Sequence, residues 1–178
     1  LFALPLLDGD SEITVLNGAE SKGYIDMTIN ALNRFGIEIE NRNYIKYIIK
    51  GNQKYKAQSF TAEADYSQAA FFLVAGALGC DIECLGLSDD SLQGDREIIS
   101  LIKKVGGKIV KGKNGGICAR RTALMRATDI DASEIPDLVP ILAVLLSFCK
   151  GESRIYNAGR LRMKESDRLA ATAGELSH

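Results

Sequence analysis

Residues 66–78 read YSQAAFFLVAGAL, and residues 136–149 read PDLVPILAVLLSFC. Both segments are apolar on nearly every side of a helix, which is typical of helices that are buried on most faces. The longest almost purely apolar run, residues 138–148, has 11 residues, whereas a membrane-spanning helix needs about 20. We therefore expect two buried helices of a globular fold, with no membrane as partner.

Each buried helix belongs to a repeated series of elements. A short strand precedes it, and a second strand, a polar turn and an amphipathic helix follow it. The first two amphipathic helices end at Gly36 and Gly106, 70 residues apart, and glycine supplies the left-handed residue that ends many helices. The expected strands are residues 12–16, 59–63, 82–87, 128–131 and 153–156, and the expected amphipathic helices are residues 24–35, 95–105 and 164–176.

A hairpin is expected after each complete amphipathic helix, at residues 37–49 and 108–119, where alternating apolar residues flank turn formers. The unit is therefore β-α-β-α-β-β. Residues 59–120 contain one complete copy, and residues 127–178 contain a truncated one. Because the helices are more apolar than the strands, we expect an α/β (α+β) fold with helices inside and sheets outside. A first helix at residues 1–7 would belong to a preceding copy, so the fold is expected to be incomplete at both ends.

The composition indicates which binding partners and which cellular compartment to expect. The 22 Lys+Arg and 23 Asp+Glu residues give a net charge of −1, which offers no general attraction to nucleic acid. Residues 103–126 hold eight basic residues and no acid, and we interpret them as a solvated hairpin face. The four cysteines, Cys80, Cys84, Cys118 and Cys149, are expected to be reduced core thiols of a cytoplasmic protein without bound zinc.

Charged residues gather where two helices are expected to begin. Lys164 and Arg168 lie four residues apart in KESDR, so on one helix face they would repel each other unless an anion lies between them. A solvated helix start is the alternative. Asp137 stands at the start of an otherwise apolar helix. It is either a partner of the helix dipole or a catalytic base.

Other polar residues at helix starts have simpler interpretations. Asp65 is expected to cap the helix that follows it, with Gln68 three residues on. Ser133 or Glu134 is a candidate cap of the second buried helix. Ser21 occupies a position equivalent to that of Ser91 in the repeat, where a hydroxyl either caps a helix or contacts a phosphate. Capping is favoured.

Five segments together carry a resemblance to a known family: ESKGYIDMTINAL, EADYSQAAFFLVAGALG, SLQGDREI, DIDASEIPDLVPILAVL and RIYNAGRLRMKESDRLAA. In order and spacing they resemble the 5-enolpyruvylshikimate-3-phosphate synthases, or 3-phosphoshikimate 1-carboxyvinyltransferases. The resemblance implies an inside-out barrel fold of two domains, each with three copies of the repeat. Residues 1–60 would be the C-terminal part of the first domain, and residues 61–178 the N-terminal part of the second.

The resemblance also implies an activity. These enzymes transfer the enolpyruvyl group of phosphoenolpyruvate to the 5-hydroxyl of shikimate 3-phosphate and release phosphate, in the shikimate pathway of aromatic amino-acid biosynthesis. They need neither a metal nor an organic cofactor. The alternatives are a UDP-N-acetylglucosamine enolpyruvyl transferase and a non-catalytic binding module of the same fold. A polypeptide of these 178 residues alone is expected to be inactive and to self-associate through exposed sheet edges.

Site residues follow from the resemblance one position at a time. Asp137 resembles the proton acceptor that also binds the substrate hydroxyl, and Glu165 resembles the acid that protonates the methylene carbon and later takes the proton back. Lys164 resembles the cation near the reacting hydroxyl and the leaving phosphate, and Arg168 resembles a phosphoenolpyruvate ligand. Ser21 resembles a contact of the shikimate phosphate, with Tyr24 beside it. Gly23 and Arg160 depart from the common family pattern, so no role is assigned to Arg160.

Overall fold

The computed structural model describes residues 1–177 and divides the chain into two compact units, Leu1–Ala62 and Glu63–His178. Residues 53–65 carry no helix or strand. Residues 51–58, which read GNQKYKAQ and have the composition expected of a linker, lie largely within this irregular segment. No helix among the described residues is both long and apolar enough to cross a membrane.

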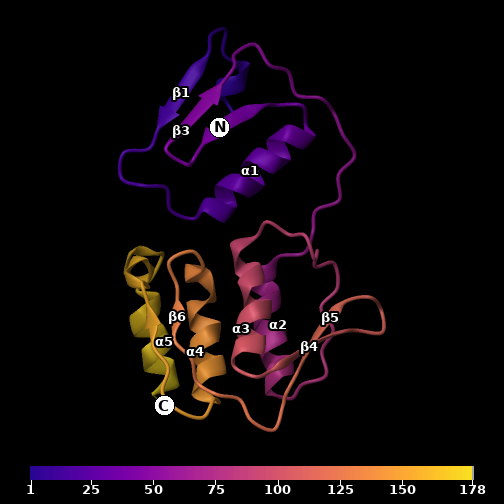
Figure 1. Ribbon diagram of the computed structural model, residues 1–178, viewed down its shortest axis with the longest axis vertical. Coiled ribbons are helices and arrows are strands. Elements are labelled where there is room, and N and C mark those ends of the chain that lie inside the picture. The colour runs from indigo at the N-terminus through magenta and orange to yellow at the C-terminus, as the bar shows by residue number, and fades with distance from the viewer. Residues whose placement is uncertain (178) are drawn as a thin grey trace. The chain divides into compact units, whose positions relative to one another are not determined.

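The first unit is a three-stranded antiparallel sheet with one helix (Figure 1). Strands β1 (Ser11–Thr14) and β2 (Ile39–Arg42) both pair with the central strand β3 (Lys46–Ile49). Helix α1 spans Lys22–Arg34. Alternate residues of β3 are buried, as expected for a strand with one face in the core. The buried apolar residues of the unit include Leu32, Ile37, Tyr47 and Ile49.

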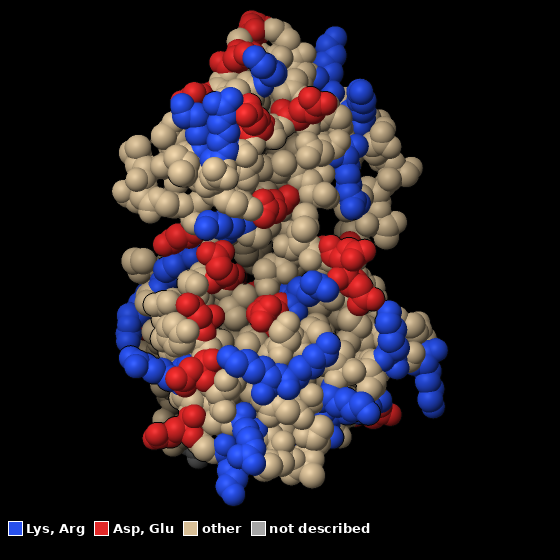
Figure 2. Space-filling model, in the orientation of Figure 1, with Lys and Arg blue, Asp and Glu red and all other residues tan. Residues whose placement is uncertain are grey.

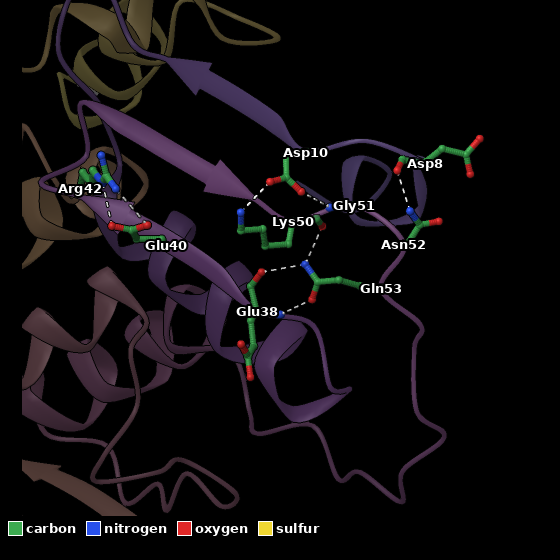
Figure 3. A network of polar contacts seen from close by, with 9 residues as sticks. All are labelled: Asp8, Asp10, Glu38, Glu40, Arg42, Lys50, Gly51, Asn52 and Gln53. Carbon is green, nitrogen blue, oxygen red and sulfur yellow. Dashed lines mark hydrogen bonds and ion pairs between the residues drawn. The ribbon is translucent and has the colours of Figure 1, made fainter.

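Polar contacts tie the ends of these strands together (Figure 3). The Lys50 ammonium lies 2.6 Å from Oδ2 of Asp10, and Gly51 N–H donates to Oδ1 of the same carboxylate at 3.1 Å. The Gln53 amide accepts from Glu38 N–H at 2.7 Å and donates to Glu38 O at 3.0 Å. A methyl group on Gly51 would lie 2.4 Å from the carbonyl oxygen of Gly9, so this close approach requires glycine.

The second unit packs helices around a common core (Figure 1). Helices α2 and α4 are largely buried, with Leu73, Val74, Leu142 and Leu145 at most 1% exposed. Gly76 lets α2 approach β5, because a methyl group there would lie 2.8 Å from Ala119 O. The regular elements are α2 (Tyr66–Leu78), η2 (Gly94–Glu97), α3 (Ile98–Lys104), β4 (Lys108–Lys111), β5 (Ile117–Arg120), β6 (Ile130–Asp131), η3 (Pro136–Leu138), α4 (Val139–Ser147), β7 (Ile155–Tyr156), η4 (Gly159–Met163) and α5 (Arg168–Leu176), where η denotes a 3₁₀ turn.

The predictions of two buried helices and of two hairpins are confirmed, but several expected strands are shorter or absent. Residues 59–63 form no strand, and residues 82–87 retain only an isolated bridge between Cys84 and Ile117. Strands at 128–131 and 153–156 shrink to the two-residue pair β6 and β7. A strand needs a neighbouring backbone to pair with along its whole length, and these segments make only sparse ladder contacts.

Helix starts also differ from expectation. Residues 1–7 contain only the 3₁₀ turn η1 (Leu4–Leu6), and the last helix begins at Arg168 rather than at Lys164. Asp65 caps α2 as predicted, accepting from Ser67 N–H at 2.7 Å. Neither Ser133 nor Glu134 caps the second buried helix, because η3 begins after Ile135 without a side-chain cap. Pro140 lies in the first turn of α4, where the 3₁₀ turn precedes regular helix.

Charged side chains lie mainly at the surface, whereas the cysteines differ in burial. On the face seen in Figure 2, basic and acidic side chains are interspersed. In the basic hairpin, Lys111 lies 2.9 Å from Asp89 and Arg120 lies 2.7 Å from Asp81. All four cysteines are free, but only Cys118 is buried and Cys80 is exposed. Cys84 and Cys149 are half-buried and pack against the core. The prediction of four core thiols is therefore wrong for Cys80.

Candidate active site

A pocket of about 580 Å³ opens in the second unit where α2, α4 and α5 begin. The same end of each helix therefore contributes to its wall, and the partial positive charges at these N-terminal ends favour an anionic ligand. Both acidic and basic side chains reach the pocket. Its lining residues are Asp65, Ser67, Gln68, Phe71, Asp137, Pro140, Lys164, Arg168, Ala171 and Thr172.

Asp137 lies at the centre of the charged side of this pocket. Its Oδ1 atom is 2.7 Å from Nη1 of Arg168 and 3.4 Å from Nζ of Lys164. The side chains of Asp137, Lys164 and Arg168 are 25%, 31% and 27% exposed, so the cluster is shielded from bulk water yet open to the pocket. Asp137 and Lys164, two of the candidate site residues from the sequence, therefore line one pocket.

Glu165 joins the cluster through Arg168. The guanidinium donates to Oε1 of Glu165 from Nε at 2.9 Å and from Nη2 at 2.6 Å. Arg168 thus bridges the carboxylates of Asp137 and Glu165. Glu165 itself does not line the pocket and its side chain is 68% exposed, so in this arrangement it stands at the outer side of the guanidinium.

Local sequence explains how these side chains are brought together. Asp137 falls in the turn η3 because Pro136 favours the first position of such a turn. Asp167 caps α5 by accepting from Ala170 N–H at 3.0 Å, and its second oxygen lies 2.9 Å from Arg162. The cap starts α5 at Arg168 and leaves Lys164 in extended backbone, with φ −78° and ψ −169°.

The expectation that Lys164 and Arg168 share one helix face is therefore wrong, since Lys164 precedes the helix. The two cations still converge, because both point at the same Asp137 oxygen. Their convergence comes from the turn ahead of α5 and from the position of η3. Helical spacing plays no part in it.

Hydrogen bonds between Glu165 and Arg168 shift the pKa values of both groups. The bond from Arg168 is the main cause that lowers the pKa of Glu165, and the bond to Glu165 is the main cause that raises the pKa of Arg168. Both groups are thereby held in their charged forms. An anion that binds Arg168 competes with Glu165 for the guanidinium, so it relieves the effect that lowers the pKa of Glu165.

Ser21 and Tyr24 lie in the first unit, at the start of α1. Ser21 immediately precedes the helix in a left-handed conformation, with φ 54° and ψ 48°, and its side chain makes no capping bond. Capping, the favoured interpretation of Ser21, is thus wrong. Tyr24 N–H donates to Ser21 O at 3.0 Å, and the Tyr24 side chain is 45% exposed. The two residues expected at one phosphate site are therefore neighbours in space.

Sequence reasoning missed part of the pocket wall, including Ser67, Gln68 and Thr172. Ser67 and Gln68 were interpreted only through the cap at Asp65. The available signal was their position, because the start of one buried helix in the repeat is equivalent to the start of the other, where Asp137 stands in η3. Among the described residues, no group of three or more His, Cys, Asp or Glu side chains is placed to hold a metal ion.

The fold has known counterparts among solved structures. An EPSP synthase from Acinetobacter baumannii superposes with a TM-score of 0.76 over 98% of this chain and 40% of that chain, at 22% identity. The enolpyruvyl transferase NikO from Streptomyces tendae gives a TM-score of 0.58 over 85% of this chain and 37% of its own, at 16% identity. The architecture is that of an enolpyruvyl transferase, incomplete as expected.

Sequence comparison narrows this class to one family. The family model for EPSP synthase (3-phosphoshikimate 1-carboxyvinyltransferase) matches residues 1–178, and the chain belongs to this family. It is 51% identical over 177 residues to the 3-phosphoshikimate 1-carboxyvinyltransferase of Clostridium novyi (strain NT), and 48% identical to that of Clostridioides difficile (strain 630). Each match covers 99% of this chain and 40% of the relative, so the chain spans about 40% of their length.

Proposed function

We propose that the protein carrying this sequence transfers the enolpyruvyl group of phosphoenolpyruvate to the 5-hydroxyl of shikimate 3-phosphate and releases phosphate. The observation that carries the proposal is the convergence of Arg168 and Lys164 on Asp137 in a pocket at three helix starts. Two cations beside a carboxylate suit a reaction that joins anionic substrates and needs a base. The family match supports this substrate pair over a nucleotide sugar.

In the proposed reaction, Asp137 accepts the proton of the 5-hydroxyl as its oxygen attacks C2 of phosphoenolpyruvate. Glu165 donates a proton to the methylene carbon, which becomes a methyl group, and this addition gives a tetrahedral intermediate. The bond between C2 and the phosphate oxygen then breaks. Glu165 takes a proton back from the methyl group, the carbon–carbon double bond re-forms, and phosphate leaves with the proton that Asp137 had accepted.

The cations have separate tasks in this scheme. Arg168 binds phosphoenolpyruvate, because a guanidinium donates two parallel hydrogen bonds to a carboxylate or phosphate. Lys164 stabilises the negative charge that grows on the attacking and leaving oxygens. Transfer of Arg168 from Glu165 to substrate raises the pKa of Glu165 towards its ordinary value, since the bond that lowers it is lost. Glu165 then becomes a better proton donor only once phosphoenolpyruvate is bound.

Ser21 and Tyr24 complete the proposal as contacts of the shikimate phosphate. The support is their adjacency at the start of α1, since the positive end of the helix dipole favours a phosphate. A Ser21→Ala variant is expected to raise KM for shikimate 3-phosphate and to leave KM for phosphoenolpyruvate nearly unchanged.

A phosphate-release assay tests the function in the protein at its natural length. Release should require both phosphoenolpyruvate and shikimate 3-phosphate, and omission of either should abolish it. Release that depends on UDP-N-acetylglucosamine would assign the protein to the alternative transferase class. Binding of both substrates without release would identify a non-catalytic module.

A further inference from the structure

Asp95 is a buried carboxyl group directly behind the pocket wall. Its exposed fraction is only 4%, and among residues 1–177 it is the one charged residue that is buried. The hydroxyl of Ser67 donates to its Oδ2 atom at 2.5 Å. Ser67 itself lines the pocket together with Asp137, Lys164 and Arg168. One buried acid thus reaches the candidate site through a single intervening hydroxyl.

The position of Asp95 is fixed by hydrogen bonds between its own segment and the start of α2. The side-chain carbonyl of Gln93 accepts from Tyr66 N–H at 2.7 Å, and its amide group donates to Ala64 O at 2.9 Å. Tyr66 also donates its hydroxyl to Ser88 O at 2.9 Å. On the other side, a methyl group on Gly94 would lie 3.2 Å from Glu134 O. The segment before Asp95 is therefore held between α2 and the approach to η3.

A carboxyl group in this place does not favour folding. Burial is the main cause that raises the pKa of Asp95, and the nearby carboxylates Asp137 and Asp65 raise it further. The bond from Ser67 and the charge of Lys164 act in the opposite direction. A neutral side chain of the same size would avoid the desolvation and the repulsion. The acid is thus better explained by what it does to Ser67 than by stability.

We propose that Asp95 is a positioning residue that holds the Ser67 hydroxyl with its oxygen lone pairs towards the pocket. An ionised carboxylate only accepts hydrogen bonds, whereas a hydroxyl has one hydrogen and two lone pairs. The bond to Asp95 uses that hydrogen, so Ser67 presents only an acceptor to a ligand. Ser67 then recognises a hydroxyl group of the substrate, which, resting on the proposed function, is a ring hydroxyl of shikimate 3-phosphate.

Two substitutions and their combination test this role. Asp95→Asn keeps the shape of the side chain but supplies an amide donor, which turns the Ser67 hydroxyl round. Ser67→Ala removes the hydroxyl. Each variant is expected to raise KM for shikimate 3-phosphate about 3- to 10-fold, the effect of losing a hydrogen bond between two uncharged hydroxyl groups. KM for phosphoenolpyruvate should change less than threefold, roughly.

The double variant separates a positioning role from a direct one. Because Asp95 acts through Ser67, Asp95→Asn should add nothing to the effect of Ser67→Ala, so the two losses are not additive. Additive losses would show that Asp95 acts by another route and would overturn the inference. Asp81→Asn, a change of an exposed carboxylate that pairs with Arg120, is the matched control and should keep wild-type kinetics.

Kinetics of the wild-type protein distinguish this inference from the proposed function. Wild-type protein without turnover of shikimate 3-phosphate overturns both. Normal wild-type turnover with an unchanged KM in folded Asp95→Asn overturns the positioning role alone. Thermal unfolding checks that each variant is folded. If Asp95→Asn does not fold, an unchanged KM for shikimate 3-phosphate in Ser67→Ala overturns the role by itself.

Discussion

The guanidinium of Arg168 lies 2.7 Å from the carboxylate of Asp137, although 31 residues separate them in the chain. The same guanidinium also holds Glu165, so one cation restrains two of the three residues proposed for proton transfer and charge stabilisation. A substrate anion that binds Arg168 must compete with both carboxylates. Substrate binding and the release of Asp137 and Glu165 for proton transfer are thereby coupled in the proposed reaction.

Replacing Asp137 tests the proposed base. Asp137→Ala is expected to lower kcat about 10²- to 10⁴-fold, the usual loss when a general base is removed. Stability should fall only modestly: Lys164 and Arg168 lose the carboxylate that both contact, but all three side chains are partly open to water, which weakens such charge interactions. Steady-state phosphate release measures kcat, and urea unfolding measures stability. Asp81→Ala is the control, and a near-normal kcat in Asp137→Ala would show that the base lies elsewhere.

Arg168 is expected to control affinity for phosphoenolpyruvate. Arg168→Ala should raise KM for phosphoenolpyruvate by about 100-fold, since a charge-assisted bidentate contact is lost. Arg168→Lys should recover only part of this, because an ammonium cannot form the paired bonds. Titration with phosphoenolpyruvate measures the affinity, with Arg42→Ala, a change in the exposed pair with Glu40, as control. Equal affinity in Arg168→Ala and wild type contradicts the assignment.

The stability of the protein should depend on pH through Asp95. Its pKa is raised in the folded state, so the folded protein holds this proton at pH values where the unfolded chain, with an ordinary pKa near 3.9, has lost it. The unfolding free energy of wild type should therefore fall relative to that of Asp95→Asn as pH rises above about 4. Urea unfolding of both proteins across a pH series checks this. A difference that does not change with pH contradicts it.

Two buried tyrosines should respond oppositely to loss of their hydroxyls. The hydroxyl of Tyr47 is buried and has no hydrogen-bond partner among the described residues, whereas that of Tyr66 donates to Ser88 O at 2.9 Å. Tyr47→Phe is expected to raise the free energy of unfolding by about 1 kcal/mol, and Tyr66→Phe to lower it by about 1 kcal/mol. Chemical denaturation measures both, and destabilisation by Tyr47→Phe would reveal a partner for its hydroxyl.

Gly51 should tolerate no side chain. Gly51→Ala places a methyl group 2.4 Å from the Gly9 carbonyl oxygen, and this overpacking is expected to cost about 1–3 kcal/mol of stability. Gly9→Ala is the matched control, because its methyl group would meet no described atom within 4 Å. Thermal denaturation compares the two variants. Equal melting temperatures would mean that the segment around Gly51 relaxes without loss.

Much of the local structure follows from residues that are near one another in the chain. The largely apolar character of residues 66–78 and 139–147 predicts buried helices, because most faces of such a helix disfavour water. Asp65 caps α2 because its carboxylate lies within reach of N–H groups two and three residues on. The alternation of apolar residues in 46–49 likewise predicts a strand with one buried face.

The pattern of apolar residues along the chain was least informative where an element depends on a contact with another segment or on a particular side-chain hydrogen bond. Residues 59–63 have strand-like composition but form no strand, since strand formation depends on a neighbouring backbone that composition does not reveal. The last helix begins at Arg168, whereas the sequence predicted a start at residue 164. Asp167 fixes this start by accepting a hydrogen bond from Ala170 N–H, and the pattern of apolar residues does not reveal such a bond.

The sequence by itself determined the family, the two buried helices and the identity of the acidic and basic residues at their starts. Only the tertiary structure decided which of these charges meet: Arg168 with Asp137 across 31 residues, and Ser67 with Asp95 across 28. The physical reason is the range of the interactions. Helix burial and capping depend on side chains a few residues apart, whereas a hydrogen bond between elements requires the core to bring a donor atom and an acceptor atom from distant segments within roughly 3 Å of each other.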